Sequence, residues 1–465
     1  MKFQPAHDTI CALATPPGTG AIAVIRLSGP MTFPVIGKIF HPVEKRTDLS
    51  KVAGFTLHLG MIGEGNSLLD EVLVAVFKAP HSYTGEDLAE ISCHGSPYIQ
   101  QKILELLLQQ GLRMAGPGEF TLRAFMNGKF DLSQAEAVAD LIASHSSSSH
   151  ELALQQMRGD FSKKIRALRE KLIEFTALIE LELDFSEEQM EFADRGKMDE
   201  LLRMITTALQ ELVDSFRLGN VIKHGIPVAI IGKPNVGKST LLNAILNEEK
   251  AIVSEIPGTT RDAIEDTIVI GGYSFRFIDT AGLRASVDAI ETMGIERTWK
   301  KIAEATIILY VFDVTAHSFE DVMEAIGELQ ELTADKSRHL LLIGNKTDLL
   351  EELPRGFRNF VEYETIFVSG KRSENIHLIA ASLQNLVQHA ELSDHTLVSN
   401  TRHYEALQRA LEAIHSVEQG LHTGISSDLL TTDLRKALYH LGEITGEITT
   451  DEILSNIFSR FCIGK

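Results

Sequence analysis

A short apolar run from Ile226 to Ile231 leads into a stretch whose residue types could bind phosphate. The pattern G-x-x-x-x-G-K-S runs from Gly232 to Ser239, and a helix-like stretch follows it. Glycines at this spacing let backbone N–H groups point at phosphate oxygens, and a helix N-terminus adds partial positive charge. Lys238 would reach the β- and γ-phosphates, while the Ser239 hydroxyl would ligate Mg²⁺. The strand, turn and helix together predict a phosphate-binding loop (P-loop).

Two further motifs follow predicted strands and indicate which nucleotide binds. The strand Tyr273–Ile278 ends in Asp279-Thr-Ala-Gly282, which places a carboxylate near Mg²⁺ and a glycine N–H near the γ-phosphate. The strand His339–Ile343 ends in Gly344-Asn-Lys-Thr-Asp348. Asp348 can accept both N1–H and the 2-amino group of guanine, whereas adenine offers neither donor and would leave the carboxylate unpaired. We therefore expect a guanine nucleotide.

The elements that must position these motifs alternate between strands and helices. Thr306–Phe312 is another apolar strand, and Ile366-Phe-Val-Ser-Gly370 is typical of a short base-contacting loop. This alternation predicts a doubly wound α/β sheet with the nucleotide at its carboxyl edge.

Length and composition bound the rest. The 465 residues suggest about three domains, and the hydrophobic share of 44% is ordinary for a soluble globular protein. We find no apolar run near the roughly 20 residues of a membrane span, and Asp8 with Pro16-Pro17 argues against a signal peptide. Three scattered cysteines are too few for a disulfide framework or a zinc site. These features predict a cytoplasmic protein without a membrane partner.

The net charge of −20 argues against binding nucleic acid through bulk electrostatics. If RNA is a partner, a local patch or a second protein must supply the cations.

Proline usage predicts the domain organisation. Nine of the thirteen prolines lie at or before Pro117 and the other four lie between Pro227 and Pro354. Long proline-free stretches permit long helices, so two helical blocks are expected on either side of the nucleotide-binding domain. We predict a multidomain α/β plus all-α chain, with an inserted Ras-like P-loop domain and a discontinuous helical domain. The predicted boundaries are 1–125 (N-terminal α/β), 126–222 (helical), 223–388 (nucleotide-binding) and 389–465 (helical).

The N-terminal stretch holds a second group of candidate functional residues. Arg26 lies among apolar strand residues, where a buried guanidinium needs an anionic partner or ligand, and Glu90 similarly interrupts a strand. The segment Arg113–Asp131 mixes turn formers with charged residues. From these residues alone we infer a polar site in an α/β domain, without a named ligand. The strands expected here are Ile22–Leu27, Phe55–Leu59, Leu73–Phe77 and Leu88–Ser92, and the helix is Tyr98–Leu108.

Taken together, these stretches resemble the MnmE (TrmE) family of tRNA-modification GTPases. The resemblance covers essentially the whole chain and is carried by ATPPGTGAIAVIRLSG, PGEFTLRAFMNGKFDLSQAEAV, the GTTRD and DTAG motifs, and the terminal FCIGK. It implies a cytoplasmic homodimer that works on tRNA with the flavoprotein MnmG, with which it would form a heterotetramer. The expected product is an aminomethyl-type (carboxymethylaminomethyl) group on carbon 5 of the wobble uridine. A formyl- or methylene-tetrahydrofolate held by an N-terminal folate-binding-like domain would supply the carbon.

The resemblance also implies roles for individual residues. Folate contacts fall on Arg26, Glu90, Lys129 and Lys465, whose charges suit the glutamate tail and the pterin N–H donors of folate. Cys462 lies near that site, where either a direct or a structural role is open.

The same resemblance supplies the ions and the hydrolytic residue. Ser239 and Thr260 would ligate Mg²⁺, and the K⁺ ligands would be Asn235, Ser254, Ile256 and Thr259; Ser254 departs from the Thr found in some relatives. Leu283, after Gly282, cannot orient water as Gln does in Ras-like proteins. That role passes to Glu291, with Lys238 as the second catalytic residue. The residues expected to contact GTP are Asn235, Val236, Gly237, Lys238, Ser239, Thr240, Ser254, Glu255, Ile256, Pro257, Gly258, Thr259, Thr260, Asp279, Thr280, Ala281, Gly282, Asn345, Lys346, Asp348, Ser369, Gly370 and Lys371.

Three alternatives differ in class. A ribosome-assembly GTPase would share the P-loop, GTTRD and potassium features, but a basic RNA-binding module would be expected, and this acidic chain lacks one. A folate-dependent aminomethyltransferase with a vestigial switch, or a non-enzymatic scaffold, is disfavoured because Lys238, Asp279 and Asp348 are all present.

Overall fold

The computed structural model describes residues 8–44, 48–65, 67–186, 195–250, 266–278, 305–333, 338–360, 363–388, 396–423, 425 and 427–465. The chain forms two compact units. The first combines residues 1–142, 155–209 and 406–465, and the second combines residues 143–154 and 210–405. The four domain boundaries expected from the sequence are finer than this division and stay predictions.

A seven-stranded, mostly antiparallel sheet forms the N-terminal part of the first unit. Its strands are β1 (Ile10–Leu13), β2 (Ile22–Ser28), β3 (Phe40–Pro42), β4 (Thr56–Glu64), β5 (Ser67–Phe77), β6 (Leu88–His94) and β7 (Arg113–Met114). They are ordered β3-β4-β5-β6-β2-β1-β7, with β1 and β7 parallel. The four strands expected from the sequence are confirmed, but β4 continues to Glu64 and β5 begins at Ser67, so both are longer than expected.

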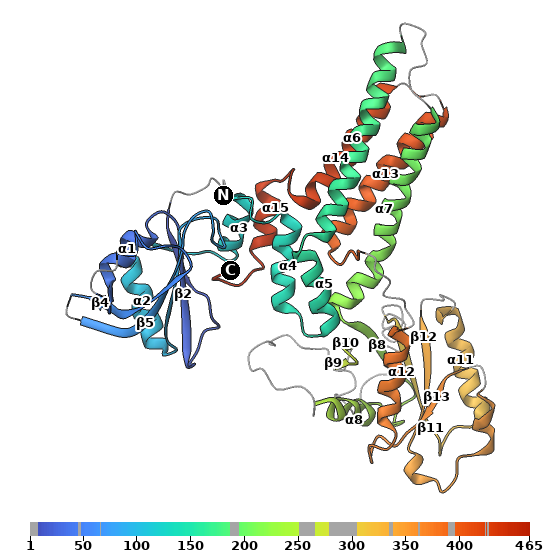
Figure 1. The fold of residues 1–465 in the computed structure, drawn as a ribbon. Coiled ribbons are helices and arrows are strands. Elements are labelled where there is room, and N and C mark those ends of the chain that lie inside the picture. The colour runs from blue at the N-terminus through green and yellow to red at the C-terminus, as the bar shows by residue number, and fades with distance from the viewer. Residues whose placement is uncertain are drawn as a thin grey trace. The chain divides into compact units, whose positions relative to one another are not determined.

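Helices α1 (Thr32–Ile39) and α2 (Pro97–Gln109) cover one face of this sheet (Figure 1). Residues alternate along β5, so that Val72, Val74 and Val76 point into the core that the two helices share with the sheet. Alternation of this kind is what a strand with one buried face requires. The segment read as turn-rich holds a further helix, α3 (Glu119–Met126).

Long helices make up the proline-free regions. Within the first unit, α6 (Asp160–Ser186) and α14 (Ser427–Thr445) lie side by side although they are far apart in sequence (Figure 1). Apolar residues at helical spacing along α6 are buried, namely Ile165, Leu168, Leu172, Phe175 and Ile179. The remaining helices of the two blocks are α4 (Leu132–Ala143), α5 (Ser147–Met157), α7 (Arg195–His224), α13 (Thr401–Thr423) and α15 (Asp451–Phe458).

The second unit contains a six-stranded sheet. Its strands are β8 (Ile226–Ile231), β9 (Asp266–Ile270), β10 (Tyr273–Phe277), β11 (Ile307–Asp313), β12 (His339–Asn345) and β13 (Thr365–Phe367), and its helices are α8 (Lys238–Lys250), α11 (Phe319–Thr333) and α12 (Ile376–Gln388). The order is β13-β12-β11-β8-β10-β9, and only the edge strand β9 pairs antiparallel.

Every residue of β8 and β11 is buried, as expected for central parallel strands covered on both faces. The chain runs from β8 to one side of the sheet and later returns to the other, so the strand order reverses between β8 and β11. Ligands of doubly wound sheets bind at such a switch point, beyond the carboxyl ends of the strands. The predicted multidomain α/β plus helical architecture is therefore confirmed. In the described part of the chain, no helix combines the length and the apolar character needed to span a bilayer.

Candidate nucleotide site and candidate ligand site

The P-loop connects the carboxyl end of β8 to the start of α8. Gly237 has φ +94, and a Cβ added there would lie 2.3 Å from Nδ2 of Asn345. Only glycine fits a left-handed conformation in such close contact. Asn235 also has positive φ, at 62°, which asparagine tolerates better than most residues. The P-loop therefore packs closely against Asn345, a residue of the predicted base-binding motif at the end of β12.

Lys238 lies back across this loop. Its ammonium donates hydrogen bonds to the carbonyl oxygens of Gly232 at 2.7 Å and Lys233 at 2.8 Å. The positive charge is thus held at the mouth of the loop, next to the N-terminus of α8, where phosphate oxygens would compete for it. Ser239 and Thr240 follow as the next residues of α8.

The predicted base-binding residues contact one another and the P-loop. Asn345 is buried; its Nδ2 donates to the Val236 carbonyl at 2.9 Å, and its Oδ1 accepts from the Gly370 N–H at 3.0 Å. Asp348 Oδ1 accepts from the Ser369 hydroxyl at 2.7 Å. Lys346 Nζ lies 2.6 Å from Asp313 Oδ2. Four segments of the chain are therefore joined at the carboxyl edge of the sheet.

Part of the predicted site lies outside the described residues. This applies to the loop positions assigned to GTP and ion binding, to the DTAG motif and to the water-orienting glutamate. They are Ser254, Glu255, Ile256, Pro257, Gly258, Thr259, Thr260, Asp279, Thr280, Ala281, Gly282 and Glu291. Lys371, by contrast, follows Gly370 directly and is exposed.

In the first unit, Arg26 of β2 and Glu90 of β6 are cross-strand neighbours. Two nitrogens of the Arg26 guanidinium approach Glu90 Oε1, Nε at 2.8 Å and Nη2 at 2.7 Å. The anionic partner required by a guanidinium in an apolar strand is therefore Glu90. Arg26 Nη1 also donates to the Gly464 carbonyl at 3.3 Å.

The C-terminal segment is docked beside this pair. Ile463 forms a β-bridge with Pro117, the Gly118 N–H donates to the Cys462 carbonyl, and the Phe120 N–H donates to the Lys465 carbonyl. Burial and the neighbouring Arg26 charge lower the pKa of the Lys465 ammonium, against the opposite effect of Glu90. Cys462 is exposed. The structure thus brings together Arg26, Glu90 and Lys465.

Lys129 has a different support. Its ammonium donates to the Pro80 carbonyl at 3.1 Å, on the loop between β5 and β6. Asn127 holds the same loop by donating to the Thr84 carbonyl at 2.7 Å. Lys129 therefore contacts the loop that also carries Tyr83, whose ring lies next to the Arg26 guanidinium.

Sequence reasoning missed two aromatic residues at this site. The Arg26 guanidinium lies 5.3 Å from the ring centroid of Tyr83 and 5.7 Å from that of Phe120. Both distances are within the range of cation–π attraction. Burial raises the pKa of the Tyr83 hydroxyl, which contacts the Thr121 hydroxyl. The sequence offered one signal for this contact, which is that Tyr83 is an aromatic residue within the otherwise polar run Ser82–Asp87.

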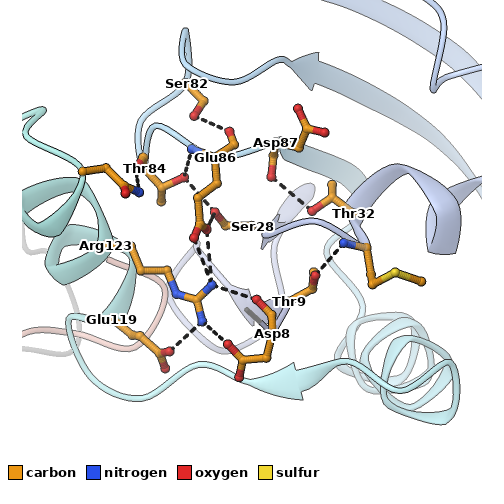
Figure 2. A network of polar contacts seen from close by, with 12 residues as sticks. Asp8, Thr9, Ser28, Thr32, Ser82, Thr84, Glu86, Asp87, Glu119 and Arg123 are labelled. Carbon is orange, nitrogen blue, oxygen red and sulfur yellow. Dashed lines mark hydrogen bonds and ion pairs between the residues drawn. The ribbon is translucent and has the colours of Figure 1, made fainter. Parts of the chain in front are cut away.

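A polar network around Arg123 also holds the β5–β6 loop. Figure 2 shows the Arg123 guanidinium between three carboxylates, with Nη2 contacting Asp8 at 2.7 Å and Glu119 at 3.0 Å, and Nη1 contacting Glu86 at 3.2 Å. Glu86 also accepts from the Ser28 hydroxyl at 2.6 Å. The Arg123 side chain is 10% exposed, whereas that of Asp8 is 37% exposed. The network links β2, the β5–β6 loop and α3 through charge-assisted hydrogen bonds.

Comparison with known proteins agrees with this architecture. Residues 9–129 match the family model described as the GTP-binding protein TrmE N-terminus, and residues 132–462 match that of the MnmE helical domain. A protein of Flavobacterium psychrophilum named tRNA modification GTPase MnmE is 52% identical over 460 residues, which cover 99% of each chain. A Bacteroides fragilis protein of the same name is 52% identical over 472 residues, 99% of this chain and 100% of the relative.

Among solved structures, the G domain of FeoB from Methanococcus jannaschii is 23% identical, covers 35% of this chain and 98% of that chain, and has a TM-score of 0.26. The family models cover most of the chain, and relatives over half identical cover nearly all of it. The chain therefore belongs to the MnmE family of tRNA modification GTPases.

Proposed function

We propose that this protein hydrolyses GTP as a subunit of a tRNA-modifying complex. The observation that carries the nucleotide part is the arrangement at the end of β12. Asn345 joins the P-loop to the Gly370 loop, and Asp348 is oriented by Ser369. Phosphate recognition and base recognition are thus built into one edge of the sheet. The name of the relatives, tRNA modification GTPase, supports the rest of the proposal.

Guanine selection follows from the Asp348 carboxylate. One hydrogen bond from Ser369 orients the group, while its remaining lone pairs can accept from N1–H and the 2-amino group of guanine. Xanthine carries an acceptor where guanine carries the 2-amino donor. Asp348→Asn introduces a donor and should therefore reverse the preference, so that the variant hydrolyses XTP faster than GTP. A variant that still prefers GTP would remove Asp348 from the base contact.

The P-loop residues also fit the ions. Ser239 lies in the first turn of α8 and, with Thr260, would hold Mg²⁺, which neutralises phosphate charge. Asn235 lies exposed on the loop and, with Ser254, Ile256 and Thr259, would hold K⁺. Glu291 would orient the attacking water, and Lys238 would stabilise charge on the transferred phosphate.

The Arg26 group fits a reduced folate, which would supply a one-carbon unit. Arg26, Glu90 and Lys465 put two cations and a carboxylate at one partly buried place, and Lys129 stands on an adjoining loop. The cations suit the glutamate tail of folate and the carboxylate suits the pterin N–H donors. The tail that carries Lys465 also presents the exposed Cys462 thiol to this region.

The acceptor in this proposal is carbon 5 of the wobble uridine of certain tRNAs, which would gain a carboxymethylaminomethyl group. The protein would act in the cytoplasm as a homodimer with MnmG. Mass spectrometry of tRNA nucleosides from a deletion strain tests this. The modified uridine should be lost, return with the wild-type gene and stay absent with Lys238→Ala. An unchanged nucleoside profile in the deletion strain would overturn the proposal.

A further inference from the structure

Asp313 is a buried acidic residue at the carboxyl end of β11, outside the predicted nucleotide motifs. In the parallel register it stands opposite Asn345, the first residue of the base-binding motif. Only 10% of its side chain is exposed, compared with 32% for Lys346. A carboxylate in such a place is costly unless it is paired and hydrogen-bonded.

Both oxygens of Asp313 accept hydrogen bonds. Oδ1 accepts from the Thr315 backbone N–H at 2.9 Å and from the Thr315 hydroxyl at 2.7 Å. Oδ2 accepts from the Lys346 ammonium at 2.6 Å. Burial alone would raise the pKa of Asp313, yet the hydrogen bonds from Lys346 and Thr315 hold it below its usual value. The residue therefore stays ionised and attracts the lysine with full charge.

The backbone of Lys346 directs its side chain to this partner. Lys346 has φ +70 and ψ +33, a left-handed conformation that is costly for a residue with a long side chain. The contacts around it fix that turn, because the Val314 N–H donates to the Asn345 carbonyl and the Thr347 N–H donates to the Val368 carbonyl. The strained conformation is thus maintained by neighbours just beyond the ends of β11 and β13.

The position of the ammonium matters because Asp348 is only two residues away. A lysine without another partner in this loop would be drawn to the Asp348 carboxylate, and a paired carboxylate is a weaker acceptor for guanine. We propose that Asp313 is a specificity-determining positioning residue, which holds the Lys346 ammonium and keeps Asp348 open to the guanine base. The inference rests on the proposed GTP binding and deepens it.

The test compares nucleotide affinities of purified full-length wild type and Asp313→Asn, which keeps the shape and removes the charge. GTP, GDP and inosine triphosphate, which lacks the 2-amino group, are titrated. GTP affinity should fall at least about tenfold, equivalent to about 1.4 kcal/mol. The GTP-to-inosine-triphosphate preference should shrink, while the GTP-to-GDP ratio stays constant because phosphate contacts are untouched. Loss of structure alone would lower all affinities in proportion.

Two further variants make the result decisive. Glu320→Gln removes an exposed acidic charge nearby on α11 and should leave all three affinities unchanged. Lys346→Met should make a second Asp313→Asn change nearly silent, since no ammonium remains to be positioned. Unchanged base preference in Asp313→Asn, or full additivity with Lys346→Met, would overturn the inference. In a separate titration of the wild type with ATP, an affinity equal to that for GTP would instead overturn the proposed function.

Discussion

Replacement of Gly464 by alanine tests whether the docked C-terminal tail builds the candidate folate site. Gly464 has φ +96, and a Cβ added to it would lie 2.4 Å from the Leu13 carbonyl oxygen and 2.9 Å from the Ala14 Cα. Both atoms belong to the backbone at the end of β1, which cannot move as a flexible side chain would. The left-handed conformation adds about 1–2 kcal/mol for an alanine.

This cost is comparable to what holds the tail. The Ile463–Pro117 β-bridge and three hydrogen bonds dock it, and the bonds are Gly118 to Cys462, Phe120 to Lys465, and Arg26 to Gly464. The two backbone bonds contribute about 0.5–1.5 kcal/mol net each and the bond from the charged Arg26 about 1.5–3 kcal/mol, and their lengths of 3.2 to 3.4 Å place all three toward the weak end. Strain of this size, together with a backbone clash, should therefore increase the fraction of molecules in which the C-terminal tail is detached. We expect reduced-folate affinity to fall about tenfold or more while GTP turnover is retained.

Gly111→Ala is the matched control. Gly111 has φ +90 but nothing lies within 4 Å of an added Cβ, so this variant carries the backbone strain without the clash. Hydrogen exchange by mass spectrometry should show faster exchange at the amides of Gly118 and Phe120 in Gly464→Ala only. Equal exchange and equal folate affinity in the two variants would refute the reasoning.

Three other predictions concern separate parts of the molecule. GTP turnover in KCl should exceed that in NaCl at equal ionic strength by at least about tenfold, or about 1.4 kcal/mol of barrier, and Glu291→Ala should lower turnover with little loss of GTP affinity; equal rates in the two salts would contradict this. Arg26→Ala should weaken folate binding by about 1.5–3 kcal/mol in calorimetric titration, the scale of a charged hydrogen bond, and unchanged binding would remove Arg26 from the site. Burial raises the pKa of Glu119, but hydrogen bonds from Arg113, Gly116 and Arg123 lower it by more, so the net shift is downward. The ionised carboxylate therefore stabilises the folded state above the ordinary pKa of about 4.3, and this stabilisation is lost as the pH falls through the lower folded-state pKa. Thermal melting of Glu119→Gln between pH 3 and 6 should be less pH-dependent than that of wild type, and parallel curves would count against this network.

Elements with strong local patterns could be predicted from the sequence. The fully apolar runs of β8 and β11 predict buried parallel strands, and the glycine spacing from Gly232 to Ser239 predicts the P-loop between β8 and α8. Helix α3 was missed because it begins after Gly118 in a left-handed conformation, within a segment dominated by turn formers. Its residues are helical largely because Phe120 and Leu122 are buried in tertiary contacts, which outweigh local preference.

Contacts between distant segments could not be predicted in the same way. Asp313 looks like an ordinary strand end until the register places it opposite Asn345, and only the fold shows that Lys346 is its partner. The two sites nevertheless share one local signal, which is a glycine where backbones or side chains meet too closely for a Cβ. Gly237 meets Asn345 and Gly464 meets Leu13, each across a long stretch of chain. A glycine in a motif therefore indicates that another segment approaches closely there. Which segment approaches depends on the order of the strands in the sheet and on the path of the C-terminal tail, and the glycine itself does not reveal it.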